Sequence, residues 1–155
     1  MALTQVQVGM GGNSNAPAFS AYQNTQQTGI PQFSSTKITF DVKEFDTNNY
    51  FASSRFQPLI AGYYQVNAAI QIPYASSSAY ILTQLGKNGN VYKTGNSCVG
   101  NGSTYPASTI SSVVYLNGTT DYVEVYAYGS NGTATFSTQN GLDRTYFNGA
   151  LVRAA

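Results

Sequence analysis

The sequence contains no histidine, no tryptophan and a single cysteine. Without histidine, the chain cannot build a Ser-His-Asp or Cys-His catalytic arrangement, and most zinc sites are excluded as well. The lone Cys98 cannot form an intramolecular disulfide. We expect it to be a small residue in a loop rather than a nucleophile.

Charge is also scarce. Charged residues make up 8% of the chain and the net charge is +1, whereas an average globular protein has about 25% charged residues. The basic residues are scattered between Lys37 and Arg153, without the basic stripe typical of nucleic-acid-binding proteins. The apolar runs are too short to span a membrane, and residues 1–8 lack the regions of a secretory signal. The sequence predicts a protein made in a cytoplasm, with neither nucleic acid nor membrane as a partner.

The six carboxylates include a close group, Asp41, Glu44 and Asp46. A glycosidase needs two carboxylates across a sugar, but nothing apolar nearby would raise the pKa of one of these three. We interpret them as a solvated loop between strands, which disfavours a polysaccharide hydrolase. Calcium prefers about six to eight oxygen ligands, usually including several carboxylates. The sequence therefore predicts no enzymatic activity, no metal and no cofactor.

The chain shows a period-two alternation of apolar and polar residues. Apolar residues occupy every second position from Tyr64 to Ile72, and Val123, Val125 and Ala127 alternate with tyrosines. Helical spacing would mix these two sets, whereas a strand separates them. Further strand candidates rich in β-branched and aromatic residues are 18–22, 37–40, 80–85, 110–116, 134–137 and 145–152. The pattern predicts an all-β sandwich or jelly roll.

Six Asn-Gly dipeptides punctuate the strand candidates. This pair accepts the positive φ angles of tight turns. Five of them lie between strand candidates and predict hairpin turns, at 88–89, 101–102, 117–118, 131–132 and 140–141. The sixth, Asn148-Gly149, falls inside a strand and predicts a bulge or close packing. Asn101, Asn117 and Asn131 also match the glycosylation pattern, but we interpret them as turns.

Residues 1–17 differ from the remainder because they are polar, rich in glycine and end at Pro17. We interpret them as an N-terminal arm, an attachment segment, and 18–155 as one jelly-roll domain. No helix follows Gly9-Met10-Gly11-Gly12 to hold a phosphate.

Several motifs resemble, in the correct order, those of complement C1q and tumour-necrosis-factor-like head domains. They are Ala18-Phe19-Ser20-Ala21, Ile38-Thr39-Phe40-Asp41, the spaced Tyr50, Phe56, Pro58, Gly62 and Tyr64, the hairpin Leu85-Gly86-Lys87-Asn88-Gly89, Leu116-Asn117-Gly118 with Asp121 and Val123, and Phe147, Gly149 and Leu151. The resemblance covers nearly the whole chain. It implies a ten-stranded, homotrimeric jelly-roll sandwich with both termini at the base near the threefold axis.

The tyrosines suggest where such a trimer would form. The chain has 13 tyrosines, more than one thin core can absorb, and a row of exposed tyrosines would be a sticky patch. We predict a trimer interface at Tyr63, Tyr122, Tyr126 and Tyr128. The alternative is that these tyrosines line an edge or a face covered by a loop.

The opening Met-Ala-Leu-Thr-Gln-Val-Gln-Val-Gly-Met-Gly-Gly, followed directly by the head, resembles bacteriophage virion proteins with C1q-like domains. This predicts a capsid decoration (cement) protein in the virion, bound to the major capsid protein through Leu3, Val6, Val8 and Met10. The alternative is a receptor-binding tip on a tail-fibre shaft. Loops at the far end would then bind host glycan through Tyr74, Tyr80 and Tyr105.

Overall fold

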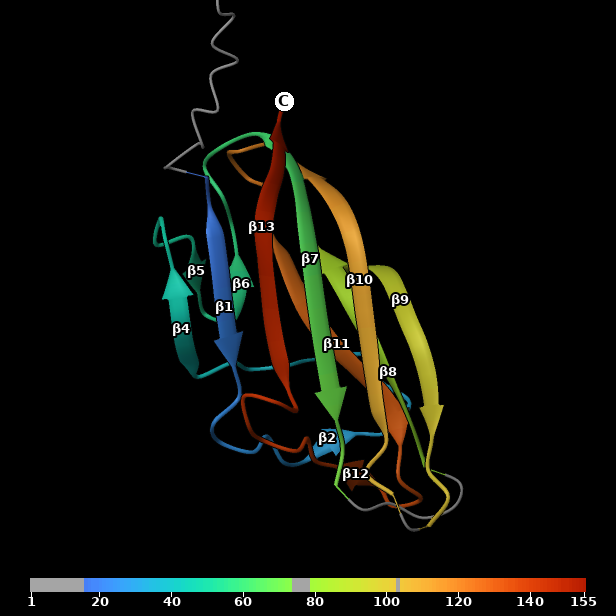
Figure 1. Cartoon of the computed structure of the whole chain (residues 1–155). Helices are drawn as coiled ribbons and strands as arrows, with labels where there is room; N and C mark the ends of the chain where they lie inside the picture. Colours follow the sequence, from blue (N-terminus) through green and yellow to red (C-terminus); the bar gives the residue numbers. More distant parts are fainter. Residues whose placement is uncertain (1–15, 74–78, 103) are drawn as a thin grey trace, which may run out of the picture.

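The computed structural model describes residues 16–73, 79–102 and 104–155, and these form an all-β sandwich (Figure 1). Every paired strand is antiparallel to its neighbour. The five-stranded sheet has the order β10 (Ala107–Leu116), β7 (Gly62–Gln71), β13 (Tyr146–Ala154), β1 (Ala18–Tyr22) and β4 (Val42–Asp46). The six-stranded sheet contains β5 (Phe51–Ala52), β6 (Arg55–Phe56), β11 (Val123–Ser130), β8 (Tyr80–Lys87) and β9 (Asn90–Val99), with β3 (Thr36–Lys37) paired to β11. A small sheet joins β12 (Thr135–Phe136) to β2 (Ile30–Pro31).

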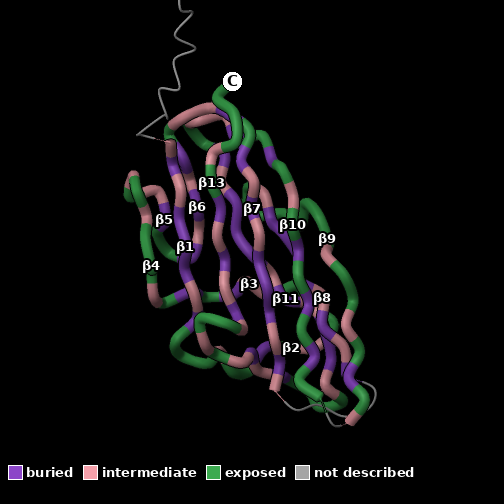
Figure 2. The backbone as a smooth tube through the Cα atoms, viewed as in Figure 1, coloured by how far each residue is buried: buried purple, intermediate pink, exposed green. Residues whose placement is uncertain are grey.

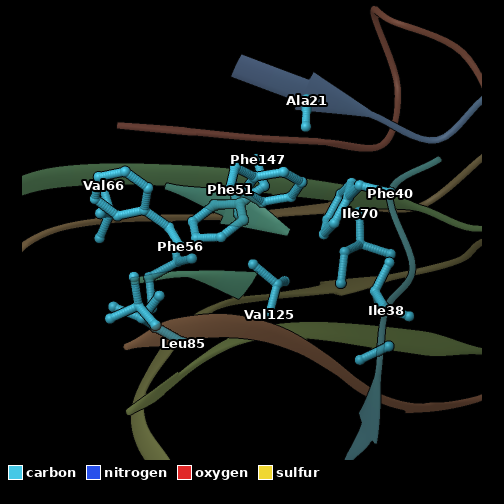
Figure 3. Close-up of a cluster of buried hydrophobic side chains, with 14 of the residues drawn as sticks. Ala21, Ile38, Phe40, Phe51, Phe56, Val66, Ile70, Leu85, Val125 and Phe147 are labelled. Atoms are coloured by element: carbon cyan, nitrogen blue, oxygen red, sulfur yellow. The ribbon is translucent and has the colours of Figure 1, made fainter. Parts of the chain in front are cut away.

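The core lies between the two large sheets, where alternate side chains of both sheets meet (Figures 2 and 3). Tyr64 and Val66 of β7 and Val123 and Val125 of β11 all point into this layer and are buried. Phe19 stacks on Phe56, with ring centroids 4.2 Å apart. Such stacking binds β1 of one sheet to β6 of the other, beyond what the buried area alone contributes.

The expected all-β fold is confirmed, and the central strands lie close to their predicted ranges. The expected count of ten strands is not confirmed, because the structure divides the described chain into eight longer strands and five strands of two residues. The candidate at 37–40 is wrong in its extent. Only Thr36–Lys37 pairs with β11, and Ile38 then adds one backbone bond to Val125 before the chain leaves the sheet.

The predicted hairpin turns are correct at only one of five places. Asn88 and Gly89, with φ of 55° and 81°, connect the paired strands β8 and β9. The other four Asn-Gly pairs keep a positive φ at the glycine but connect strands of different sheets. At Gly149 the close packing is observed, because an added Cβ would lie 2.8 Å from the carbonyl oxygen of Gln65.

The two ends of the described chain lie at the same end of the sandwich (Figure 1). Ala18 pairs with Ala150, and Ala154 with Gly62. We call this the proximal end, and the opposite end, with Tyr22 and Gln71, the distal end. At this end Pro17, which precedes β1, accepts a backbone hydrogen bond from Leu151 of β13.

Candidate interaction face

The five-stranded sheet turns one face to the core and the other outward, and we call the outward one the open face. The pairing of its strands arranges the outward side chains in rows across the sheet. From proximal to distal the rows are Tyr115, Tyr63 and Arg153, with Val152 in the adjacent bulge of β13; Val113, Gln65, Ala150 and Ala18; Ser111, Asn67, Asn148, Ser20 and Phe45; Thr109, Ala69, Tyr146 and Tyr22.

The proximal part of the open face is apolar and exposed. The rings of Tyr63 and Tyr115 lie 5.4 Å apart between their centroids. Beside them, Val113 is 47% exposed and Val152 is 63% exposed. Monomeric soluble proteins rarely keep contiguous apolar patches in water unless the patch binds something.

A shallow hollow lies next to this patch, over β1 and β13. Its lining includes the small side chains of Ala18, Ser20 and Ala150, and Phe45 of the edge strand β4 also lines it. Phe45 is 51% exposed. The open face thus carries protruding rings towards β10 and a depression towards β4.

Hydrogen-bonded polar side chains cross the middle of the open face. Ser111 donates to the Asn67 side-chain oxygen at 2.8 Å, and the Asn67 amide nitrogen donates to the Asn148 side-chain oxygen at 3.1 Å. The Gln65 amide nitrogen donates to Ser111 at 2.9 Å and to Asn67 at 3.1 Å. We call Ser111, Asn67 and Asn148 the amide belt. None of the outward side chains on β7, β10 and β1 is charged.

The structure divides the four tyrosines predicted for one interface between two opposite faces. Tyr63 points outward from the five-stranded sheet and is exposed. Tyr126 and Tyr128 point outward from β11 of the six-stranded sheet, because Val125 and Ala127 fill the core side of that strand.

Contacts within the chain half-bury the tyrosines of the six-stranded sheet. The Arg55 guanidinium lies 3.6 Å from the centre of the Tyr122 ring, and Tyr128 lies beside Tyr80, with ring centroids 6.4 Å apart. Tyr126 packs on Gly86, where an added Cβ would meet the ring at 2.3 Å. Burial and the bond to Glu124 raise the pKa of Tyr126 to about 12.

Glu124 is a buried carboxylate on this second face. Its oxygens lie 2.7 Å from the Lys37 ammonium and 3.9 Å from the Arg55 guanidinium, and accept a 2.7 Å bond from Tyr126. Burial alone would raise its pKa. The bonds from Lys37 and Tyr126 and the charges of Lys37 and Arg55 outweigh burial and hold the pKa of Glu124 below its ordinary value. The group has the contacts of a structural ion pair.

The acidic group at 41–46 is not the solvated loop that we expected, because Glu44 and Asp46 lie on strand β4. Each carboxylate accepts hydrogen bonds from different groups of the chain. Asp41 accepts from the backbone N–H groups of Asn24 and Thr25, Asp46 from those of Tyr50 and Phe51, and Glu44 from the Ser20 hydroxyl. Within the described residues, no three acidic or cysteine side chains are grouped as metal ligands would be.

Cys98 also differs from expectation. It lies on strand β9, half-buried against the core, rather than in a loop. The edge strand β9 shows little alternation of polarity, so the pattern did not predict a strand there.

At the distal end, Tyr105 is exposed and lines a shallow polar pocket with Gln71, Asp143 and Arg144. The Arg144 Nε lies 3.6 Å from the Asp143 carboxylate. Tyr80 does not line this pocket and instead contacts Phe33 and Tyr128. Tyr74 and the predicted attachment residues Leu3, Val6, Val8 and Met10 lie outside the described residues. In the described ranges, no helix could span a membrane.

No protein-family model and no curated protein matches the sequence. In structure, the chain is similar to the globular domain of zebrafish complement 1qA protein, with a TM-score of 0.64 over 90% of this chain and 99% of that chain, at 19% identity. Murine APRIL gives a TM-score of 0.64 over 88% and 99%, at 8% identity. Eiger TNF from S. frugiperda gives 0.60 over 91% and 95%, at 9% identity.

These neighbours are C1q and TNF-family jelly-roll heads, and none of the three carries the name of an enzyme. The fold of this chain is therefore a C1q/TNF-like jelly roll, as the sequence motifs indicated. At these identities the similarity extends to the fold alone.

Proposed function

We propose that this chain is a non-enzymatic head that assembles as a homotrimer through the open face and serves as a bacteriophage virion surface protein, a capsid decoration protein. The observation that carries the proposal is the open face, whose outward side chains on β7, β10 and β1 are uncharged and which exposes Tyr63, Tyr115, Val113 and Val152. A catalytic site gathers groups with matched pKa values in a cleft, whereas the perturbed carboxylates here are held in local structural contacts.

The size of the open face suits a specific interface. Three strands of nine or ten residues and two strands of five residues, spaced about 4.8 Å apart, cover about 600 Å². A stable interface buries about 800 Å² on each partner. The area of the open face thus approaches what a specific interface buries on one partner.

The shape of the face supports assembly with identical copies. Rings protrude on the side of Tyr115 and the surface is hollow on the side of Ala18 and Ala150. A protruding region that fits a hollow elsewhere on the same molecule makes a head-to-tail contact, which closes into a ring when the rotation permits. Three copies form such a ring, in line with the trimer that the C1q/TNF resemblance implies.

The assignment to a capsid rests on the arm and the surface composition. The proximal end, where Ala18 begins β1, lies beside the C-terminus, and we take this end as the base of the head from which the arm starts. A threefold head matches the threefold and quasi-threefold positions of an icosahedral shell. The arm attaches the head to the major capsid protein, for example by adding a strand to a sheet edge there.

Two measurements test this proposal. Light scattering after size-exclusion chromatography should give the mass of three chains, and a monomer at micromolar concentration would refute the homotrimer. Val113→Asp/Val152→Asp should give folded monomers. Val91→Asp/Val99→Asp, at two valines of β9 with matching exposures of 46% and 63%, should remain trimeric.

The capsid role is tested separately, with capsids from a phage that lacks the protein. The full chain should sediment with these capsids in hundreds of copies per particle. Deletion of residues 2–15 should leave a trimer that stays in the supernatant. If the truncated trimer still binds capsids, the arm is not the attachment segment.

A receptor-binding tail-fibre tip is the second candidate, and the distal pocket favours it. An exposed tyrosine ring beside an arginine, a carboxylate and a glutamine offers stacking and hydrogen bonds together, as sugar binding requires. Purified trimer would then bind host cells and lose this binding in Tyr105→Ala. About a dozen copies per virion would favour this candidate, and hundreds would favour decoration.

A further inference from the structure

The open face contains a polar strip where an interface built only for affinity would have apolar side chains. The amide belt lies between the row of Val113, Gln65, Ala150 and Ala18 on its proximal side and the row of Thr109, Ala69, Tyr146 and Tyr22 on its distal side. We infer that the amide belt fixes the alignment of subunits along the strand direction. This inference rests on the proposed self-assembly.

The hydrogen bonds within one chain hold the belt in a defined orientation. The side-chain oxygen of Asn67 accepts from Ser111 and Gln65, and that of Asn148 accepts from Asn67. In the described part of the chain, no group accepts from the amide nitrogen of Asn148. One end of the belt is therefore a donor without an acceptor among the described residues.

Acceptors are available at the same height on the sheet. Ser20 is paired with Asn148 across β1 and β13, and its hydroxyl donates to Glu44 at 2.7 Å, which leaves the oxygen lone pairs to accept. Ser111, at the other end of the belt, also carries a hydroxyl oxygen. A second copy in the same alignment thus brings hydroxyl oxygens to the level of the Asn148 amide.

Covering the face removes water from the belt, so each amide must then find a partner or remain unsatisfied. Rows on one face of a sheet are about 7 Å apart along the strands. A neighbour displaced by one row towards the proximal end would set the Asn148 amide against Ala18 or Val113 in place of Ser20 or Ser111, and neither of these side chains accepts a hydrogen bond. A displacement the other way would set it against Tyr22 or Thr109, and the tyrosine hydroxyl lies farther from the sheet than a serine hydroxyl. The alignment that brings the belts to one level satisfies the amide with the serine hydroxyls at that height. A single buried asparagine fixes the alignment and oligomeric state of coiled coils in the same way, at a cost in stability.

The first test replaces the belt by apolar side chains of similar size. Native mass spectrometry of the wild type should show one trimeric species. Asn67→Leu/Asn148→Leu should lose this uniqueness and give a mixture of oligomers. The matched control is Thr94→Leu/Ser97→Leu, which adds two leucines at exposed positions of β9 in the other sheet and should remain a single trimer.

The second test does not depend on how the leucine variant folds. In Asn148→Asp, a carboxylate oxygen still accepts from Asn67, so the subunit keeps its local structure. Three carboxylates at one level then repel each other, and we expect the trimer dissociation constant to rise by about 100-fold or more. Asn90→Asp makes the same charge change at an exposed position of β9 and should leave the constant unchanged.

The outcomes separate this inference from the proposed function. A monomeric wild type would overturn both. A trimeric wild type whose Asn148→Asp variant dissociates no more than the Asn90→Asp control would overturn the role of the belt alone. A leucine variant that forms one trimeric species would also overturn it.

Discussion

The ammonium group of Lys37 lies 2.7 Å from the carboxylate of Glu124, whose side chain is 3% exposed. Lys37 lies on β3 and Glu124 on β11, and Arg55 of β6 approaches the same oxygen. One buried carboxylate therefore connects two short strands to a long central strand. The short strands, of two residues each, have few backbone bonds of their own to hold them.

We predict that stability falls as the pH is lowered. The pKa of Glu124 is lower in the folded chain than its ordinary value of 4.5. Its contribution is therefore fully present above pH 4.5 and is lost as the pH falls through the lowered folded value. Urea unfolding between pH 6 and pH 3 should show this loss, and Glu124→Gln should weaken the pH dependence. If the pH dependence of stability is the same in Glu124→Gln as in the wild type, Glu124 is not its cause.

At neutral pH, Glu124→Gln should destabilise the fold by about 1–3 kcal/mol, because the contact with Lys37 loses its charge assistance and the attraction to Arg55 is lost. Asp143→Asn is the control. Asp143 is 82% exposed and pairs only with Arg144 at 3.6 Å, and a surface pair contributes about 0–1 kcal/mol.

Alternation of side chains was enough to predict which residues of β7 and β11 fill the core. A strand sends successive side chains to opposite sides, so Tyr64 and Val125 could be assigned to the core from the sequence. The same rule could not say which outward face is open. Tyr63 and Tyr126 have the same local pattern. Only Tyr126 meets Gly86 and Glu124, and the Gly86 contact comes from a strand 40 residues earlier in the chain.

Strand β9 and the amide belt were harder to predict from the sequence than the core residues of β7 and β11. Most residues of β9 are exposed because it is an edge strand, so no alternation marks it. Asn67 and Asn148 are 81 residues apart, and only the register of β7 and β13 brings them together. The sequence placed Asn148 in a strand, but the pairing that makes it part of a belt depends on the assembled sheet.

Tyrosine substitutions should separate the two faces. Tyr63→Ala should weaken the trimer and leave the folding of the subunit nearly unchanged, because Tyr63 is exposed. Tyr126→Ala should destabilise the subunit by about 2–3 kcal/mol, since it removes the ring that covers Gly86. Dilution series in an analytical ultracentrifuge and denaturant curves measure the two effects. Equal effects on association would mean that the six-stranded sheet also contacts a neighbour.

Gly95 of β9 packs against the backbone of β10, where the two large sheets meet at one edge of the sandwich. We predict that this position does not tolerate a side chain. A Cβ at Gly95 would lie 2.1 Å from the carbonyl oxygen of Thr109 on β10, so β9 would have to move away from the other sheet. Gly95→Ala should cost about 2 kcal/mol or more in unfolding free energy. Ser97→Ala, at an exposed position of the same strand, should change it by less than about 0.5 kcal/mol.

Two phenylalanines on neighbouring strands make a matched pair for the last prediction. Phe19 is buried between Phe56 and Phe147, with centroids 4.2 and 4.8 Å away. Phe45, on the adjacent strand β4, is half exposed and lines the hollow of the open face. Phe19→Ala should cost about 3–5 kcal/mol in stability, as for other buried aromatic truncations.

Phe45→Ala removes the same ring but leaves no cavity in the core, so the unfolding free energy of the subunit should change by less than about 1 kcal/mol. It should instead raise the trimer dissociation constant, because the hollow loses part of its apolar lining. Thermal unfolding at several protein concentrations tests this, since the midpoint of a trimer rises with concentration. If Phe45→Ala unfolds like the wild type at every concentration, the hollow over β1 and β13 is not a subunit contact.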